Sequence, residues 1–168
     1  MKLQPHQCLS AYSELRAEHL RAKGIKALLL DVDNTLAPYE QPEPDEALLL
    51  WLSQMEREGI RLAIVSNNKG DRIGLFTKAL SIPVIANAKK PLPKAFKKAM
   101  TMLGVTPAET ACIGDQIFTD ILCGRLSRLK WTVLVPPIKD KRDLLTRTKR
   151  WLEQPILKKY WREKNHDR

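Results

Sequence analysis

Three aspartates follow short apolar runs in this sequence of 168 residues. Asp31 and Asp33 stand two positions apart after the first run, and Asp115 follows a later one. Carboxylates gathered this closely repel one another unless a hard cation lies among them or one of them is protonated. Mg²⁺ suits such a cluster, because it takes oxygen ligands and is commonly shared with a substrate phosphate. One acid could then attack phosphorus and form an aspartyl-phosphate, while its neighbour protonates the leaving group and later activates water.

Residues in comparable positions suit a phosphoryl group. Ser66 and Asn67 are small hydrogen-bond donors between an apolar run and a helical stretch, where free backbone N–H groups favour anions. Lys90 brings a positive charge that could balance the negative oxygens of a transition state. Pro91 and Pro93 stiffen the chain after this lysine, so its ammonium group could be held in place.

A regular alternation of predicted strands and helices positions these residues. Apolar runs predict strands over residues 26–31, 61–66, 82–86, 110–114 and 131–135, and helical periodicity predicts helices over 45–58, 69–80, 94–103 and 119–126. This alternation predicts an α/β fold, a doubly wound parallel sheet covered on both faces. Ligands of such sheets bind outside the carboxyl ends of the strands. We therefore expect the polar residues at those ends to face one crevice.

Length and composition predict a single domain over residues 1–168, with a core over about 24–136 and a basic helical tail over about 139–168. The longest apolar run, Ala47–Leu52, is far too short to cross a bilayer, and Met1–Ser10 lacks the apolar region of a signal peptide. The three cysteines lack metal-ligand spacing, and their odd number argues against a disulfide framework. The expected location is the cytoplasm, with peripheral attachment to a membrane left open.

Positive charge is concentrated near the C-terminus. Residues 121–168 hold 14 Lys and Arg against 5 Asp and Glu, whereas residues 1–120 hold 15 against 14. Two apolar helical stripes follow one another there, separated at Pro155: Leu144, Leu145, Thr148, Trp151 and Leu152, then Ile156, Leu157, Tyr160 and Trp161. A basic amphipathic helix can lie on an anionic membrane or dock on its own domain. Docking is expected for the first stripe, and both arrangements stay open for the second. Nucleic acid is compatible with this charge but is not favoured.

Four segments, in order, resemble the motifs of the haloacid dehalogenase (HAD) superfamily. Distances of 35, 24 and 25 residues separate Asp31, Ser66, Lys90 and Asp115. The segments are Asp31-Val-Asp-Asn-Thr35, Ser66-Asn-Asn68, Lys90-Pro91 and Gly114-Asp-Gln-Ile-Phe-Thr-Asp120. The first matches the DxDxT signature of the superfamily and the last its GDxxxxD form. Four motifs in sequence on predicted strand ends are a far more specific signal than a single DxD.

The resemblance implies roles in catalysis for three residues. Asp31 would be the nucleophile and a Mg²⁺ ligand. Asp33 would be the general acid and base, and its backbone carbonyl would also reach the metal. Lys90 would neutralise charge, and it is preferred over Lys89 because Pro91 follows it directly.

The resemblance also implies roles in binding. Ser66 and Asn67 would hold the phosphate, and Thr35 would steady the first loop. Asp115 would be a further protein contact to Mg²⁺. Asp120 would orient the site from behind the ligands.

A closer resemblance covers almost the whole chain. Segments 24–36, 65–68, 88–91 and 114–120 are similar to the YqeG family, a bacterial group of HAD class IIIA phosphatases. That family is similar to mitochondrial and algal phosphatases that act on phosphatidylglycerophosphate. The intervals between motifs are filled by the core's own elements, so we expect a phosphatase without a cap domain and with an open cleft.

The resemblance therefore implies a Mg²⁺-dependent phosphomonoester phosphatase, with phosphatidylglycerophosphate as the favoured substrate and anionic lipid as a partner of the tail. Two alternatives stay open. The same chemistry could act on a soluble phosphometabolite, or a HAD-fold binding protein could use its basic tail on RNA or the ribosome.

Overall fold

A six-stranded sheet runs through the computed structural model, which describes residues 3–139, 152–158 and 160. In sheet order the strands are β1 (Gln7–Cys8), β6 (Trp131–Leu134), β5 (Thr110–Gly114), β2 (Ala27–Leu30), β3 (Arg61–Val65) and β4 (Val84–Ile85). Every neighbouring pair is parallel. The central strands β2 and β5 are buried along their whole length, as expected where helices cover both faces.

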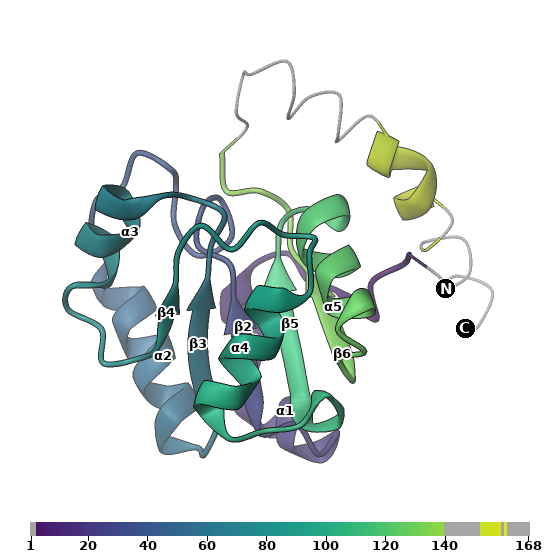
Figure 1. The fold of residues 1–168 in the computed structure, drawn as a ribbon, viewed down its shortest axis with the longest axis horizontal. Coiled ribbons are helices and arrows are strands. Elements are labelled where there is room, and N and C mark those ends of the chain that lie inside the picture. Colours follow the sequence, from purple (N-terminus) through teal and green to yellow (C-terminus); the bar gives the residue numbers. More distant parts are fainter. Residues whose placement is uncertain (1–2, 140–151, 159, 161–168) are drawn as a thin grey trace.

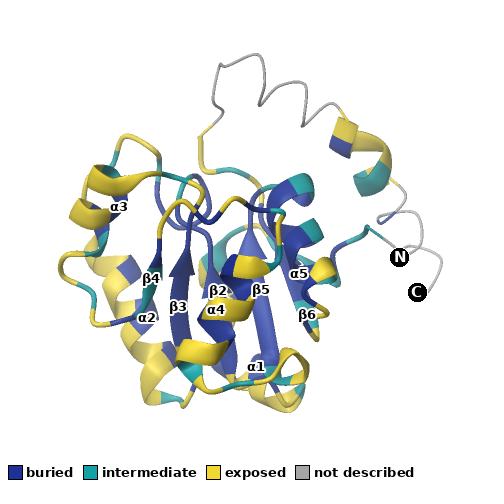
Figure 2. Cartoon of the chain, viewed as in Figure 1, coloured by how far each residue is buried: buried dark blue, intermediate teal, exposed yellow. Residues whose placement is uncertain are grey.

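Helices cover both faces of this sheet (Figure 1). One face carries α1 (Ala17–Ala22), α2 (Glu46–Arg57) and α3 (Gly70–Thr77), and the other carries α4 (Lys94–Leu103) and α5 (Leu122–Leu126). Successive strand residues point to opposite faces, so Leu28 and Leu30 join the first core and Leu29 the second. Figure 2 shows the buried sheet between helices whose outer surfaces are exposed. The predicted doubly wound α/β fold is confirmed.

Local sequence signals set the ends of the long helices. α2 follows Asp45, whose Oδ1 accepts a hydrogen bond of 2.8 Å from the Leu48 amide. α4 ends at Gly104, which adopts the left-handed conformation with a φ of 63°. Both helices therefore lie close to their predicted ranges.

The chain reverses its course across the sheet between β2 and β5. From β2 it proceeds outward to β3 and β4, then returns to β5 on the other side of β2 and continues to β6. At such a switch point, connections leaving neighbouring strands diverge and open a crevice at their carboxyl ends. Asp31 follows β2 and Asp115 follows β5, so the two acidic motifs meet at this crevice.

The sheet extends further toward the N-terminus than the predicted core of residues 24–136. β1 adds an edge strand beside β6, and α1 and Leu15 belong to the first core. Gln7 and Cys8 do not stand in an apolar run such as the one that contains β4, so the sequence gives no local signal for β1. Two 3₁₀ turns, η1 (Tyr12–Glu14) and η2 (Pro107–Glu109), complete the connections.

The helix predicted over 119–126 begins earlier and has a wider first turn. Residues Ile117–Ile121 form a π-helical turn, η3, that leads directly into α5. π-turns are frequent at functional sites, and this one carries the last motif residue, Asp120.

Part of the predicted tail lies outside the described residues, namely 140–151, 159 and 161–168, with most of the first apolar stripe. Residues 152–158 form a helix that runs through Pro155, where the sequence predicts an interruption. Ile156 and Leu157 pack against a small apolar core, and Tyr160 is buried. The described part of the second stripe is thus docked on the domain, whereas Leu152 of the first stripe is 48% exposed. Among the described residues, no helix combines the length and apolar character needed to cross a membrane.

Candidate active site

The loop after β2 is folded tightly around one carbonyl group. The Val32 oxygen accepts hydrogen bonds from the amides of Thr35, Leu36 and Ala37 at 3.0–3.2 Å. Asn34 has a positive φ of 64°, a conformation that asparagine tolerates better than most residues. This tight turn gives the two aspartates of the first motif different surroundings.

Asp31 is 9% exposed, and both of its carboxylate oxygens have partners. Its Oδ1 lies 2.7 Å from Nζ of Lys90, and its Oδ2 accepts a hydrogen bond of 2.8 Å from the Thr35 hydroxyl. The Thr35 hydroxyl thereby orients the carboxylate that the sequence predicts to be the nucleophile.

Lys90 is the buried cation of this site, whereas its neighbour Lys89 is exposed. Nζ of Lys90 lies 2.7 Å from Asp31 Oδ1 and 2.6 Å from Asp120 Oδ1. Burial by itself lowers the pKa of Lys90, but the nearby carboxylates of Asp120 and Asp31 outweigh it and hold the pKa above its ordinary value. The ammonium group therefore stays charged throughout the physiological range.

Asp120 is buried against the backbone of Gly114. A Cβ at position 114 would lie 2.3 Å from Cγ of Asp120, so the close approach requires glycine. Oδ2 of Asp120 accepts hydrogen bonds from the Gln116 amide at 3.2 Å and the Thr119 hydroxyl at 3.1 Å, while Oδ1 faces Lys90. Burial raises the pKa of Asp120, and Lys90 opposes that effect. With both oxygens engaged, Asp120 orients Lys90 and its own loop.

Asp33 lies in different surroundings from Asp31. Its Oδ1 is 3.0 Å from Nε of Arg72 on α3, and its Oδ2 accepts a hydrogen bond of 3.2 Å from the Asn68 amide group. The same guanidinium group donates to the carbonyls of Pro38 and Gln41, so it ties the loop after β2 to α3. Sequence reasoning missed Arg72, because one arginine in the first turn of a helix carries no motif signal.

Three carboxylates converge at the switch point. One oxygen from each of Asp31, Asp115 and Asp120 lies within 4.8 Å of the other two. The Lys90 ammonium group contacts two of these carboxylates, those of Asp31 and Asp120. All-oxygen donors suit hard divalent cations. The Asp33 carboxylate is not part of this group, and the metal contact predicted for Asp33 is through its backbone carbonyl.

Ser66 and Asn67 lie at the end of β3, beside the acids. The buried Ser66 hydroxyl accepts a hydrogen bond of 3.0 Å from the backbone amide of Asn68. The Asn67 side chain bonds the backbone of Lys90 twice: Oδ1 accepts from the amide at 2.6 Å, and Nδ2 donates to the carbonyl at 3.1 Å. Asn67 therefore connects the second motif to the third and fixes the position of the Lys90 backbone.

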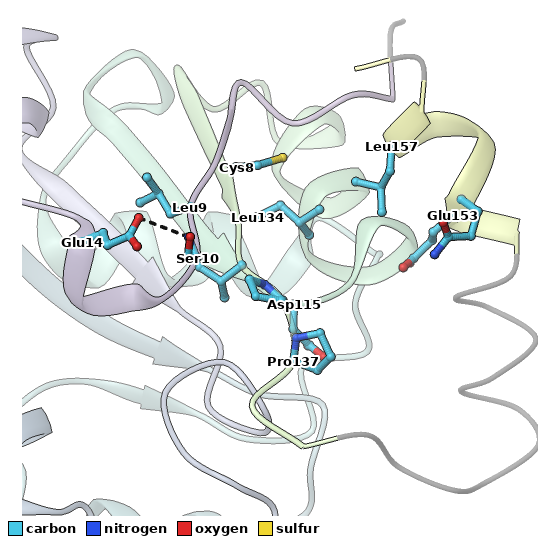
Figure 3. Close-up of a pocket in the computed structure, with 12 residues that line it drawn as sticks. Cys8, Leu9, Ser10, Glu14, Asp115, Leu134, Pro137, Glu153 and Leu157 are labelled. Atoms are coloured by element: carbon cyan, nitrogen blue, oxygen red, sulfur yellow. Dashed lines mark hydrogen bonds between the residues drawn. The ribbon is translucent and has the colours of Figure 1, made fainter. Parts of the chain in front are cut away.

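Two cavities lie at this edge of the sheet. A polar cavity of about 330 Å³ is lined by six of the predicted site residues: Asp31, Asp33, Ser66, Asn67, Lys90 and Asp120. An apolar cavity of about 490 Å³ lies between the N-terminal segment, the end of β6 and residues 152–158. Its lining includes Cys8, Leu9, Leu134, Pro137, Leu157 and, from the acid cluster, Asp115 (Figure 3).

The fold, and the four motifs that it gathers at one edge, define a phosphomonoester hydrolase of the HAD superfamily. The chain belongs to the family described as mitochondrial PGP phosphatase, whose sequence profile matches residues 1–135. The predicted resemblance to the HAD superfamily and to YqeG is thereby confirmed.

Individual relatives agree with this placement. The chain is 34% identical over 153 residues to the Bacillus subtilis (strain 168) protein named "Probable phosphatase YqeG", covering 91% of this chain and 88% of that protein. It is 30% identical over 176 aligned positions to phosphatidylglycerophosphate phosphatase 1, chloroplastic/mitochondrial, of Arabidopsis thaliana, covering 95% of this chain and 48% of the plant protein. This chain thus spans about half the length of the plant protein.

The fold is shared with solved structures of low sequence identity. One is the cobalt-bound deoxy-D-mannose-octulosonate 8-phosphate phosphatase of Haemophilus influenzae, with a TM-score of 0.55 at 18% identity over 66% of this chain and 68% of that one. Between the motifs, the described residues of this chain form only the core's own strands, helices and loops.

Proposed function

We propose that this protein is a Mg²⁺-dependent phosphatase that hydrolyses phosphatidylglycerophosphate through an aspartyl-phosphate at Asp31. The observation that carries the proposal is the buried arrangement of Asp31, Lys90 and Asp120 beside Asp115 at the switch point. A carboxylate held this firmly, next to a fixed cation, is suited to attack a phosphoryl group whose charge the surroundings already balance.

In the first step, a carboxylate oxygen of Asp31 attacks phosphorus, and the bond between phosphorus and the ester oxygen breaks. Asp33 in its protonated form gives its proton to the departing ester oxygen, so the alcohol leaves neutral. This transfer leaves Asp33 as the carboxylate that accepts hydrogen bonds from Arg72 and Asn68. The Lys90 ammonium group and the Ser66 hydroxyl, which both line the polar cavity, bind the phosphoryl oxygens.

In the second step, water attacks phosphorus of the aspartyl-phosphate, and Asp33 takes up the proton that the water loses. The bond between phosphorus and Asp31 breaks, which releases inorganic phosphate and restores both aspartates. Thr35 keeps Asp31 in one orientation through both steps, since its hydroxyl bonds the carboxylate directly.

Asp31, Asp115 and the backbone carbonyl of Asp33 would hold Mg²⁺, with Asp120 orienting them. When bound, the ion supplies charge neutralisation between the attacking carboxylate and the phosphoryl oxygens. The three carboxylates that converge there support a bound cation, and their oxygen donors support Mg²⁺ over softer metals.

The lipid substrate is supported by the apolar cavity beside Asp115. Asp115 lines this cavity, and one of its carboxylate oxygens lies within 4.8 Å of Asp31, so the apolar side chains of Leu134 and Leu157 would lie beside a ligand whose phosphate is at Asp31. The basic charge of residues 121–168 would attract the protein to an anionic membrane surface. We therefore place the enzyme at the cytoplasmic face of a membrane, bound peripherally.

The test is phosphate release from phosphatidylglycerophosphate in mixed micelles, with an aryl phosphate and the Asp31→Asn variant in parallel. Mg²⁺-dependent release from the lipid that Asp31→Asn abolishes is the expected result. Release from the aryl phosphate with an inert lipid would contradict the lipid substrate and favour a soluble phosphometabolite. No Asp31-dependent release from either would contradict the enzyme; steeply salt-dependent RNA binding would then favour the binding-protein alternative.

A further inference from the structure

A carboxylate from the C-terminal helix, residues 152–158, contacts the backbone of the loop that carries the last motif. Glu153 is 4% exposed, and its Oε1 accepts hydrogen bonds from the backbone amides of Ile117 at 2.8 Å and Phe118 at 3.2 Å. In the sequence, Glu153 is 36 residues from Ile117 and 35 residues from Phe118. Hydrogen bonds from amides to a buried carboxylate are among the stronger ones in proteins.

The two amides belong to the segment that sets the position of two site carboxylates. Ile117 and Phe118 begin η3, between Asp115 and Asp120. The amide of Asp120 donates to the Gln116 carbonyl at 3.0 Å, and the Asp120 carboxylate accepts from the Gln116 amide. The η3 turn is therefore held by two carboxylates: that of Glu153, from the helix of residues 152–158, and that of Asp120, from the turn itself.

We propose that Glu153 is a positioning residue that holds the η3 turn so that Asp115 and Asp120 stay in the metal-binding cluster. The proposal rests on the proposed function in one respect, the role of that cluster in holding a divalent cation. It assigns a part in the active site to the C-terminal helix, which contributes no motif residue.

Docking of the helix does not by itself account for a buried acid at this position. Ile156 and Leu157 supply apolar contacts, and the Tyr160 hydroxyl accepts a hydrogen bond of 3.1 Å from the Cys8 amide. Burying a carboxylate costs free energy unless its hydrogen bonds are worth more in the folded protein. The Ile117 and Phe118 amides offset part of this cost at the η3 turn, which points to a role in holding that turn.

The test compares Glu153→Ala, Glu153→Gln and the control Tyr160→Phe. Tyr160→Phe removes the hydrogen bond between the Cys8 amide and the Tyr160 hydroxyl, which anchors the same C-terminal segment without touching η3. Calorimetric titration with Mn²⁺, a substitute for Mg²⁺, measures the affinity of the cluster. Hydrogen exchange measures protection of the Ile117 and Phe118 amides, and aryl phosphate turnover separates kcat from KM.

Glu153→Ala should weaken Mn²⁺ binding about tenfold, as loss of a supporting residue behind metal ligands commonly does. It should also lower the protection of both amides and reduce kcat more than KM. Glu153→Gln should retain part of the affinity, because its side-chain oxygen can still accept these bonds. Tyr160→Phe should leave the Mn²⁺ affinity within about twofold of the wild type, since the η3 turn keeps its contacts.

Wild-type Mn²⁺ affinity in folded Glu153→Ala would overturn the proposal, and so would an equal loss in Tyr160→Phe. If Glu153→Ala does not fold, Glu153→Gln decides, because a neutral amide oxygen is a weaker acceptor than a carboxylate. Unchanged affinity in Glu153→Gln would then overturn the proposal. A wild type that binds Mn²⁺ but releases no phosphate would contradict the proposed function alone.

Discussion

The polar and apolar cavities lie at the same edge of the sheet, yet they are built from different parts of the chain. Motif residues that follow β2, β3 and β4, together with Asp120 of η3, line the polar cavity. The apolar cavity is made by segments near both ends of the chain, from Cys8 to Leu157. Asp115 links them, because it lines the apolar cavity while its carboxylate belongs to the acid cluster.

Under the proposed function, this difference separates the groups that carry out the reaction from those that select the substrate. The polar cavity holds the groups that could transfer a phosphoryl group, whatever alcohol is attached to it. The apolar cavity can distinguish substrates only by what lies beyond the phosphate. A substitution in the first should therefore affect every substrate, and one in the second should affect lipids selectively.

The largest expected effect is that of Asp31→Asn, because this substitution removes the proposed nucleophile, which all substrates would share. Turnover of both the lipid and the aryl phosphate should fall by at least about 10³-fold, as for other essential catalytic side chains. Steady-state phosphate release measures the loss, and circular dichroism checks the fold. Residual turnover above a tenth of the wild-type rate would contradict the role of Asp31.

Lys90→Met should have the next largest effect. Lys89→Met is its control, because Lys89 is the neighbouring residue and is exposed. Turnover should fall about 10²- to 10³-fold for both substrates, since a preorganised charge is lost from the transition state. Without metal, the variant should also lose about 3 kcal/mol of unfolding free energy, because Asp31 and Asp120 are left without their buried cation.

Urea unfolding with and without Mg²⁺ measures this second effect. Mg²⁺ should recover more stability in Lys90→Met than in the wild type, since the cluster has become more negative. Equal effects of Lys89→Met would show that charge near the site matters but its burial does not.

Gly114→Ala should displace Asp120, whose Cγ lies 2.3 Å from the position of the added methyl group. We expect a loss of about 1–3 kcal/mol in unfolding free energy, as for other overpacked sites, with lower turnover of both substrates. Gly74→Ala on α3 is the matched control, because nothing lies within 4 Å of its added methyl group. Thermal unfolding compares the two, and wild-type stability in Gly114→Ala would contradict the close approach.

Leu157→Asp tests the apolar cavity separately from the polar one, because it places a charge in the lining of the apolar cavity. The ratio of kcat/KM for the lipid to kcat/KM for the aryl phosphate should fall about tenfold, the effect expected from losing one buried apolar side-chain contact. Leu152→Asp is the control, since Leu152 lies on the same helix but is 48% exposed. Equal ratios in the two variants would remove the apolar cavity from substrate binding.

The smallest expected effect is a pH dependence on the β1 side of the molecule. Burial and the nearby Arg125 lower the pKa of His6 from 6.5 to about 4. Its Nδ1 accepts from the Thr132 amide at 3.0 Å, and its Nε2 lies 2.9 Å from Arg125, so the folded protein favours the neutral ring. As the pH is lowered, His6 of the unfolded chain binds a proton near pH 6.5, whereas His6 of the folded protein binds one only near pH 4. The free energy of unfolding should therefore decrease as the pH falls from 6.5 to 4.

The loss should be about 1 kcal/mol, because the ring is only half-buried and solvent screens part of the effect. Urea unfolding at several pH values between these limits measures it. His6→Asn should flatten the dependence, whereas His19→Asn, at an exposed position on α1, should not change it. A dependence that survives His6→Asn would assign it to other groups.

Most of the fold and the outline of the site could be predicted from the sequence, because the signals are local. Apolar runs and helical periods located β2 to β6 and α2 to α5, and parallel strands share one edge for their carboxyl ends. Asp31, Ser66, Lys90 and Asp115 were therefore expected to meet. The motif resemblance added their roles, which strand positions alone do not specify.

Contacts between distant positions could not be predicted in the same way. Arg72 meets Asp33 across 39 residues, and Glu153 meets Ile117 across 36. Neither arginine nor glutamate stands in a pattern that distinguishes it from a solvated surface charge. β1 is also invisible locally, since two residues form a strand only when β6 is already in place beside them.

The sequence by itself determined the order of the elements and the set of motif side chains at their ends, because local backbone preferences and apolar periods are written in neighbouring residues. Only the tertiary structure decided which charges pair, which carboxylate faces Arg72 rather than the acid cluster, and how residues 8–10, 134–137 and 153–157 come together to line an apolar cavity. Those outcomes depend on burial and on distances across the folded molecule, which become defined when the sheet assembles.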